Sequence, residues 1–248
     1  MSRRFEELDW QPTPIGEVSL RRRLEPVTGV EIHEVLLGEE YLMSSMFPVA
    51  EIALARLGLA RLDWPQLDGS GLAVAVGGLG LGFTAATVLE DERVGELFVV
   101  DALEPVIRWH QQGLVPLGPR LTADPRCRLV LGDFFALNAG AGFDPDRPDR
   151  ALDAVLIDID HAPRHLLAEG DTDLSGAGFY SAAGTRSLAR HLRPGGVYGL
   201  WSNDPPDEAY LAVLEEVFVD VAAEVVTFAN PLQGRDAANT VYLATRAA

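Results

Sequence analysis

The sequence predicts an α/β protein with a Rossmann-like, mostly parallel seven-stranded sheet and helices on both faces, preceded by a small N-terminal antiparallel β unit. From residue 72 onward, continuous apolar runs alternate with helix-like segments, which is typical of a parallel sheet covered on both faces. The first of these runs, residues 72–82, ends in glycines before a helix-like segment. Residues 15–43 instead alternate between polar and apolar side chains, as half-buried strands do.

The N-terminal unit is predicted to contain three strands and a closing helix. The strands are expected at residues 17–24, 29–37 and 40–44, because turn residues at Thr28-Gly29 and Gly38-Glu39 separate these alternating segments. Apolar residues at helical spacing predict a helix from Phe47. A loop over residues 64–71 follows, so the chain is expected to divide into residues 1–60, the β unit with its helix, and residues 61–248, the Rossmann-like domain.

The second part of the chain predicts seven strands. Helices are expected to begin near Phe83, Pro105, Tyr180 and Asp207, between these apolar runs. A sheet of this kind binds its ligands beyond the carboxyl ends of its strands. The predicted strands are residues 72–77, 96–101, 127–133, 151–158, 196–202, 223–229 and 239–246.

Composition excludes several classes of function. The chain has 248 residues and a formal net charge of −17, which argues against nucleic acid as a partner. Neither a membrane span nor a signal peptide is indicated, so we expect a cytoplasmic protein. The single cysteine, Cys127, cannot form a disulfide within the chain. His161 and His165 stand four residues apart, but Pro163 lies between them and no further ligand spacing follows, so no metal is expected.

The glycines that follow the first core strand indicate a cofactor site. Gly77, Gly78, Gly80 and Gly82 leave the backbone bare at the start of a helix, where a nucleotide-type ligand can approach closely. Phe83 occupies the third glycine position of the dinucleotide fingerprint, so the G-x-G-x-G pattern favours S-adenosylmethionine or a relative over NAD. A purely structural turn would also recruit glycine.

Acidic residues follow the next two predicted strands. Asp101 closes its strand at the position where a carboxylate can bind ribose hydroxyls, and Glu104 is the competing candidate. Asp133 could accept a hydrogen bond from an adenine amino group while Phe134 covers the ring. Helix capping and a turn next to a core phenylalanine are the alternatives for these positions.

Asp158 and Asp160 are the candidate catalytic residues. They lie two residues apart after the fourth core strand, so in an extended chain both side chains share one face. Two carboxylates beside a cofactor pocket could remove a proton from an amine or bind a cationic group, although Asp160 could instead cap the segment that follows. The loop over residues 201–206 is expected to line the substrate pocket.

The order of these motifs resembles the spermidine synthase (polyamine aminopropyltransferase) family, a branch of the class I S-adenosylmethionine-dependent methyltransferase fold. The segments that carry the resemblance are GGLGLG, VVDALEP, LGDFFAL, VLIDIDHAP and residues 179–202. The resemblance implies that Gly77, Gly78 and Gly80 cradle the methionine part of the cosubstrate. It also implies that Asp101 binds the ribose, Asp133 meets the adenine and Asp158 acts as base toward an amine. Family members are commonly homodimers, so a homodimer is expected.

The chain departs from the family pattern in three places. The second acid, Asp160, is displaced by one residue, and Leu79 replaces the acid that is usual in the glycine motif. Aligning the family's helix glutamate with Glu51 places an apolar wall where acids and a tyrosine are usual, because the aligned residues are Ser45, Met46 and Val49. An apolar wall does not neutralise an ammonium group.

The expected function is therefore a transferase that binds S-adenosylmethionine or decarboxylated S-adenosylmethionine as cosubstrate and transfers an aminopropyl group to an amine. A small-molecule methyltransferase and a catalytically inactive dimer that binds an adenosyl ligand are the alternatives. An NAD-dependent oxidoreductase is disfavoured by Phe83 at the third glycine position.

Overall fold

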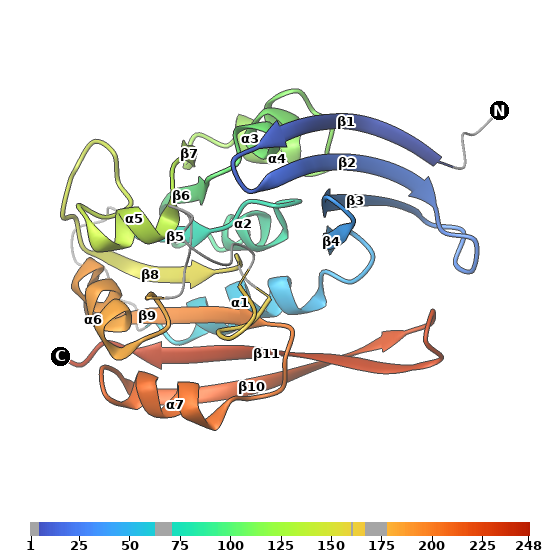
Figure 1. The fold of residues 1–248 in the computed structure, drawn as a ribbon. Coiled ribbons are helices and arrows are strands. Elements are labelled where there is room, and N and C mark those ends of the chain that lie inside the picture. Colours follow the sequence, from blue (N-terminus) through green and yellow to red (C-terminus); the bar gives the residue numbers. More distant parts are fainter. Residues whose placement is uncertain (1–4, 63–70, 160, 167–177) are drawn as a thin grey trace.

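The computed structural model describes residues 5–62, 71–159, 161–166 and 178–248. In these residues a four-stranded antiparallel sheet lies beside a seven-stranded mixed sheet that carries helices on both faces (Figure 1). Asp160 is outside the described residues. The fold class predicted from the sequence is confirmed.

The N-terminal sheet has the strand order β1-β2-β3-β4. Its strands are β1 (Phe5–Thr13), β2 (Gly16–Leu24), β3 (Glu31–Leu37) and β4 (Glu40–Ser44). The prediction of an antiparallel unit is confirmed, but β1 was not predicted. Its sequence FEELDWQPT has no regular apolar alternation, and a bulge between Glu7 and Asp9 interrupts its pairing with β2. As an edge strand it needs only one neighbour, so its sequence carries little β signal.

The large sheet has the strand order β10-β11-β9-β8-β5-β6-β7, and only β11 runs against the others. All seven predicted strands are present. The carboxyl ends of the strands other than β11 therefore lie at one edge of the sheet. The strands are β5 (Leu72–Gly77), β6 (Val94–Asp101), β7 (Cys127–Leu131), β8 (Leu152–Ile157), β9 (Leu192–Ser202), β10 (Val219–Asn230) and β11 (Arg235–Thr245).

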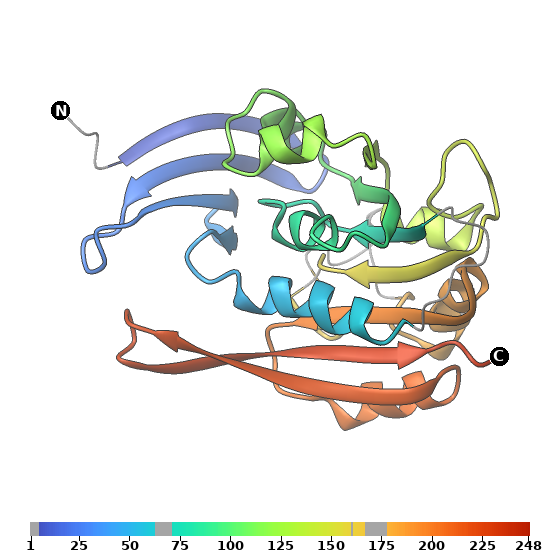
Figure 2. The same ribbon diagram turned by 180° about the vertical axis from the view of Figure 1, so that it is seen from behind.

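Helices cover both faces of the large sheet (Figures 1 and 2). One face carries α1 (Val49–Ala60), α2 (Phe83–Val88), α3 (Glu104–Gln111) and α4 (Gly118–Ala123). The other face carries α5 (Phe134–Ala139), α6 (Ala182–His191) and α7 (Glu208–Glu215). The sequence predicted neither α4 nor α5. Each is six residues long, which is too short for helical periodicity to appear.

The β10–β11 hairpin is longer than predicted. It stays paired out to Asn230 and Arg235, and its outer end projects past the sheet toward the N-terminal sheet (Figure 1). The outer half of the hairpin alternates exposed and half-buried residues, with few continuous apolar positions. This is why the apolar runs alone predicted shorter strands.

The two sheets share a hydrophobic core. Val18, Leu20 and Val35 of the N-terminal sheet belong to the same buried cluster as the apolar residues of α1, α2 and α3. The indole N–H of Trp109 on α3 donates to Asp9 Oδ2 of β1 at 2.7 Å. These contacts hold the N-terminal sheet beside the carboxyl edge of the large sheet. None of the helices in the described residues combines the length and the apolar character that crossing a membrane requires.

Candidate functional site

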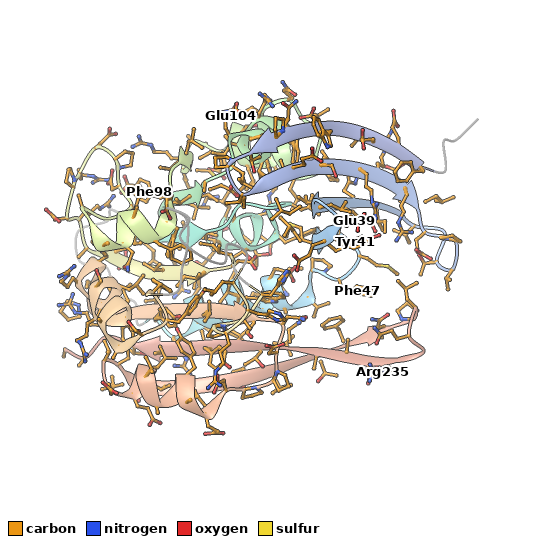
Figure 3. All side chains as sticks on the ribbon, viewed as in Figure 1. Glu39, Tyr41, Phe47, Phe98, Glu104 and Arg235 are labelled. Carbon is orange, nitrogen blue, oxygen red and sulfur yellow. The ribbon has the colours of Figure 1, made fainter. Side chains whose placement is uncertain are left out.

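A cavity of about 500 Å³ lies at the carboxyl edge of the large sheet. Its wall has three parts: the inner side of β3 and β4, the residues that follow the core strands, and the outer half of the β10–β11 hairpin. Figure 3 shows Tyr41 on β4, Phe47 before α1 and Arg235 at the far end of the hairpin around this region. Most of the candidate side chains predicted from the sequence line the cavity: Gly78, Gly80, Asp101, Asp133, Phe134 and Asp158.

The glycine turn, residues 77–82, is shaped by close backbone contacts. Gly78 has a φ of +88°, and a Cβ atom there would collide with the main-chain oxygen of Asp158. Glycine is therefore required where the turn passes the end of β8. Gly77 packs against the Phe134 ring, and Gly82 begins α2 against His110 and Leu121, so neither lines the cavity.

The turn is not as bare as the sequence suggested. The thioether of Met43 on β4 covers Gly80, and the N–H of Leu81 donates to its sulfur. Gly78 remains part of the open cavity wall beside Asp158. A ligand that approaches this turn therefore meets glycine backbone at Gly78 and a methionine side chain at Gly80.

Four of the five backbone N–H groups from residue 78 to residue 82 have a hydrogen-bond partner. Leu79 donates to the Asp101 carboxylate at 3.0 Å, and Leu81 donates to Met43. Gly78 donates to the Val100 oxygen at 2.9 Å, while Gly82 donates to the oxygen of Leu79 at 2.7 Å. The N–H of Gly80 acts on the Asp101 carboxylate as well, since it lowers the pKa of that group. The turn therefore offers fewer donors to an anionic ligand group than many helix N-termini that bind anions.

Asp101 lies at the end of β6, and each of its two carboxylate oxygens accepts a hydrogen bond from a different backbone segment. Its Oδ2 accepts from Leu79 at 3.0 Å and its Oδ1 accepts from Leu103 at 2.8 Å. Burial raises the pKa of this carboxyl, although these hydrogen bonds act in the opposite direction. Asp101 lines the cavity, and each of its oxygens has a second lone pair to which a ribose hydroxyl could donate. Glu104, the competing candidate, is instead exposed, pairs with Arg108 at 3.1 Å and does not line the cavity (Figure 3).

Asp133 and Phe134 each have a structural role and also line the cavity. Asp133 Oδ1 accepts from the N–H of Phe135 at 2.8 Å and so caps α5. Phe134 is buried and stacks on Phe143 with ring centroids 4.7 Å apart. Phe135, which the sequence did not single out, also lines the cavity. An adenine placed here would meet one carboxylate and two aromatic rings.

The centre of the cavity holds a pair of carboxyl groups, Glu51 of α1 and Asp158 after β8, which we call the carboxyl pair. The Thr84 hydroxyl lies 2.9 Å from Asp158 Oδ2 and 3.4 Å from the main-chain oxygen of Glu51, which ties the two segments together. Burial, with a smaller contribution from the neighbouring Asp158 charge, raises the pKa of Glu51 from 4.5 to about 8. Burial also raises the pKa of Asp158 from 3.8 to about 6. Near neutral pH the pair therefore holds one proton and one negative charge.

Replacing Glu51 by glutamine should make the stability of the protein less dependent on pH. The folded state keeps the Glu51 proton up to about pH 8, whereas the unfolded chain loses it near pH 4.5. The free energy of unfolding of the parent protein therefore falls as pH rises through this window. In Glu51→Gln this contribution is absent. The free energy of unfolding of the variant should therefore rise relative to that of the parent by on the order of 1 kcal/mol for each pH unit in this window.

Urea unfolding at several pH values measures this difference. Glu104→Gln is the matched control, because Glu104 is exposed and outside the cavity, and its pH dependence should follow that of the parent. Parallel pH curves for the parent and Glu51→Gln would show that Glu51 is not held protonated.

On the acceptor side, one expected residue lies outside the described part of the chain and three others do not line the cavity. Asp160 lies outside the described residues, whereas the neighbouring His161 lines the cavity with its Nε2 at 3.2 Å from Glu40 Oε1. The expectation that Ser45, Met46 and Val49 form a wall of the site is wrong, because none of the three lines the cavity. The preceding strand does so instead, since β4 runs along the cavity and the chain then turns away into α1. The residues of this wall are Tyr41, Leu42, Met43, Ser44 and Phe47.

The far side of the cavity is formed by residues at and after the end of β9 and by the hairpin. Trp201 and Asn203 line it, as expected for the loop over residues 201–206. Asn230, Gln233 and Asn239 were not predicted, because only the projecting hairpin brings them to the cavity. No periodicity or motif in the sequence marks them. Among the residues that the structure describes, no cluster of histidine, cysteine, aspartate and glutamate side chains could hold a metal ion.

Comparisons with known proteins agree with this architecture. No family model matches the chain. A spermidine synthase in complex with the transition state analogue AdoDATO superposes with a TM-score of 0.71 at 13% identity, covering 96% of this chain and 73% of the other. Spermidine synthase from Thermotoga maritima gives a TM-score of 0.69 at 13% identity, covering 96% and 72%. This chain has a spermidine synthase-like fold.

The spermidine synthase-like fold is shared with methyltransferases. Human methyltransferase-like protein 13, in complex with SAH, superposes with a TM-score of 0.56 at 20% identity, covering 79% of this chain and 81% of the other. The structural neighbours thus include proteins solved with S-adenosylmethionine analogues. The similarity extends over both sheets of this chain, since 96% of it is covered.

Proposed function

We propose that this protein is a transferase that uses decarboxylated S-adenosylmethionine, or S-adenosylmethionine, to alkylate an amine. The observation that carries the proposal is the carboxyl pair, Glu51 and Asp158, beside Gly78 at the centre of the cavity. It provides one negative charge near neutral pH at the point where the two halves of the cavity meet. The spermidine synthase-like fold supports the class of cosubstrate.

The cosubstrate half of the cavity is assigned to the ends of β7, β6 and β5. In this proposal the adenine lies against Asp133 and Phe134, and the ribose hydroxyls donate to Asp101. Gly78 and Gly80 face the sulfonium end, where Met43 adds a polarisable thioether. Glu104, Gly77 and Gly82 have no place in this arrangement, because they do not line the cavity.

Electrostatics favour the decarboxylated cosubstrate. Four carboxyl groups line the cavity, namely Glu51, Asp101, Asp133 and Asp158, while its described lining residues include no lysine or arginine. Four of the five backbone donors from residue 78 to residue 82 already have partners. A cosubstrate carboxylate would thus be desolvated without a partner, whereas an aminopropyl ammonium group would find several.

Asp158 fits the role of base in the transfer. Its pKa near 6 leaves it ionised at neutral pH, so it can accept a proton from the ammonium group of the acceptor. The freed nitrogen lone pair then forms a bond to the carbon next to the sulfonium. The carbon–sulfur bond breaks, its electrons stay on sulfur, and a neutral thioether leaves. Alignment of the two reactants in one cavity can contribute about 7–11 kcal/mol to such a step.

Methyl transfer from S-adenosylmethionine to a small molecule is the second candidate, which the likeness to a human methyltransferase-like protein favours. An inactive adenosyl-binding dimer is the third. A homodimer remains a prediction from the family resemblance.

Mass spectrometry of products separates these candidates. The protein is incubated with a primary amine and either decarboxylated S-adenosylmethionine or S-adenosylmethionine. We expect an aminopropylated amine together with methylthioadenosine in the first reaction. A methylated product from the second reaction would instead identify a methyltransferase, and adenosyl binding without either product would identify the inactive form.

A further inference from the structure

Carboxyl side chains line one half of the cavity and amide side chains line the other half, following the order of the strands in the sheet. From β7 through β6 and β5 to β8, the strand ends present Asp133, Asp101 and Asp158, with Glu51 facing the last of them. Beyond β8 the order continues through β9, β11 and β10, and the lining residues carry amides instead. We call this second set the amide wall: Asn203, Asn230, Gln233 and Asn239.

The amide wall is built into the sheet. Asn239 is 8% exposed, and its Nδ2 donates to Asn203 Oδ1 at 3.0 Å. This contact lies one position beyond the Ser202–Thr240 pair, where β9 and β11 meet at the cavity. The main-chain N–H of Asn203 donates to the oxygen of His161 at 2.7 Å, which fixes its position further. Asn230 and Gln233 continue the wall to the end of the hairpin.

Aromatic side chains complete this half of the cavity. The rings of Phe47 and Phe228 lie 5.7 Å apart between centroids, one before α1 and one on β10. Trp201 closes the inner end, and its indole N–H is buried without a hydrogen-bond partner among the described residues. This half of the cavity therefore offers apolar surface and hydrogen bonds.

Ionised groups near this half do not face its interior as free charges. Among the described lining residues from His161 to the end of the chain, His161 is the one titratable side chain, and its Nε2 lies 3.2 Å from Glu40 Oε1. Arg235 is exposed at the outer end of the hairpin and does not line the cavity (Figure 3). An ammonium group placed against the amide wall would lose water without gaining a carboxylate from the described residues that line this half.

We propose that the acceptor is a monoamine whose distal part is uncharged and carries a hydrogen-bonding group such as a hydroxyl or an amide. This inference rests on the proposed function, because it assigns the amine to Asp158 and the remainder of the acceptor to the amide wall. Amide side chains both donate and accept, so they match neutral polar groups better than a second cation. Asn203, Asn230, Gln233 and Asn239 then determine acceptor specificity.

Two amines of the same chain length test this inference. One is putrescine, and the other is the amino alcohol in which a hydroxyl replaces the second amine of putrescine. Calorimetry on the full chain, with methylthioadenosine present, measures the Kd of each amine without requiring turnover. We expect the amino alcohol to bind at least about tenfold more tightly.

A carboxylate added to the amide wall should reverse this preference. Asn239→Asp should shift the Kd ratio toward putrescine. Gln233→Glu, at an exposed position of the wall, should shift it in the same direction but by less, because Arg235 Nε donates to Gln233 Oε1 at 3.2 Å and its charge offsets part of the new one. Gln112→Glu adds the same charge at an exposed residue after α3, outside the cavity, and should leave the ratio unchanged. A ratio of Kd values within one variant does not depend on how much of the sample is folded.

Equal or tighter binding of putrescine by the parent protein would overturn the acceptor assignment and leave the proposed transferase standing. Failure of both amines to bind would also overturn it. Failure of the proposed function has a different signature: either methylthioadenosine itself does not bind, or the amino alcohol binds and no aminopropylated product forms with decarboxylated S-adenosylmethionine.

Discussion

Replacing Asp158 by asparagine should lower turnover about 10²- to 10⁴-fold, the range for removal of a positioned general base. Asparagine keeps the shape of the side chain, and its oxygen can still accept the hydrogen bond that Thr84 donates to Asp158. The variant should therefore fold and bind adenosyl ligands as the parent does. What it loses is the negative charge of the carboxyl pair, because burial, the larger cause of the raised Glu51 pKa, still favours the protonated form of Glu51 in the variant.

Steady-state kinetics with decarboxylated S-adenosylmethionine and a saturating amine measure this loss. In the parent, the rate should rise as pH passes through about 6, where Asp158 ionises, and this step should be absent from the variant. Asp236→Asn makes the same chemical change on an exposed part of β11 that does not line the cavity, and its rate should equal that of the parent. A fully active Asp158→Asn protein would remove Asp158 from the chemistry.

Replacing Asp101 by alanine should weaken binding of adenosyl ligands by about 1.5–3 kcal/mol, or roughly 10- to 150-fold in Kd. Hydrogen bonds from ribose hydroxyls to an ionised carboxylate lie in this range. The substitution also frees the N–H groups of Leu79 and Leu103, which now donate to Asp101. Part of the loss will therefore come from a less ordered glycine turn.

The variant Asp101→Asn separates these two contributions. Its side-chain oxygen can replace one of the two backbone contacts, so the turn is better preserved than in the alanine variant. We expect its affinity, measured by calorimetry with methylthioadenosine, to lie between the parent and Asp101→Ala. If all three proteins bind with the same Kd, the ribose does not lie on Asp101.

Much of the fold could be predicted because its strands are continuous apolar runs. Strands β5 and β8 are buried at every residue, so their sequences LAVAVG and LDAVLI differ clearly from the surrounding loops. Strand β1 lies at the edge of its sheet with alternating exposed and half-buried residues, and it was missed. Helices α4 and α5 have six residues each, which is less than two full turns.

The residues of the candidate site were predictable where they follow core strands. Asp101 and Asp158 come directly at strand ends, and parallel strands bring such positions to one edge. Glu51 reaches the cavity from the first turn of α1, and only the packing of that helix against α2 places it near Asp158. Met43 and the amide wall come from strands whose register the sequence does not fix.

Two residues predicted to bind the cosubstrate, Glu104 and Gly82, have structural roles that the sequence did not reveal. Glu104 begins α3 and points to solvent, where it pairs with Arg108 one turn later. Gly82 satisfies a left-handed backbone position at φ +89° and so serves the turn itself. Both roles can be assigned only when the direction of the side chain or the backbone angle is known.

Calorimetric titration of the purified chain with methylthioadenosine and, separately, with NAD tests most directly whether an adenosyl ligand occupies the cavity. We expect methylthioadenosine to bind with one site per chain and NAD not to bind measurably, because the described cavity lining has no lysine or arginine for a pyrophosphate and most backbone donors of the glycine turn already have partners. Binding of NAD without binding of methylthioadenosine would contradict the account.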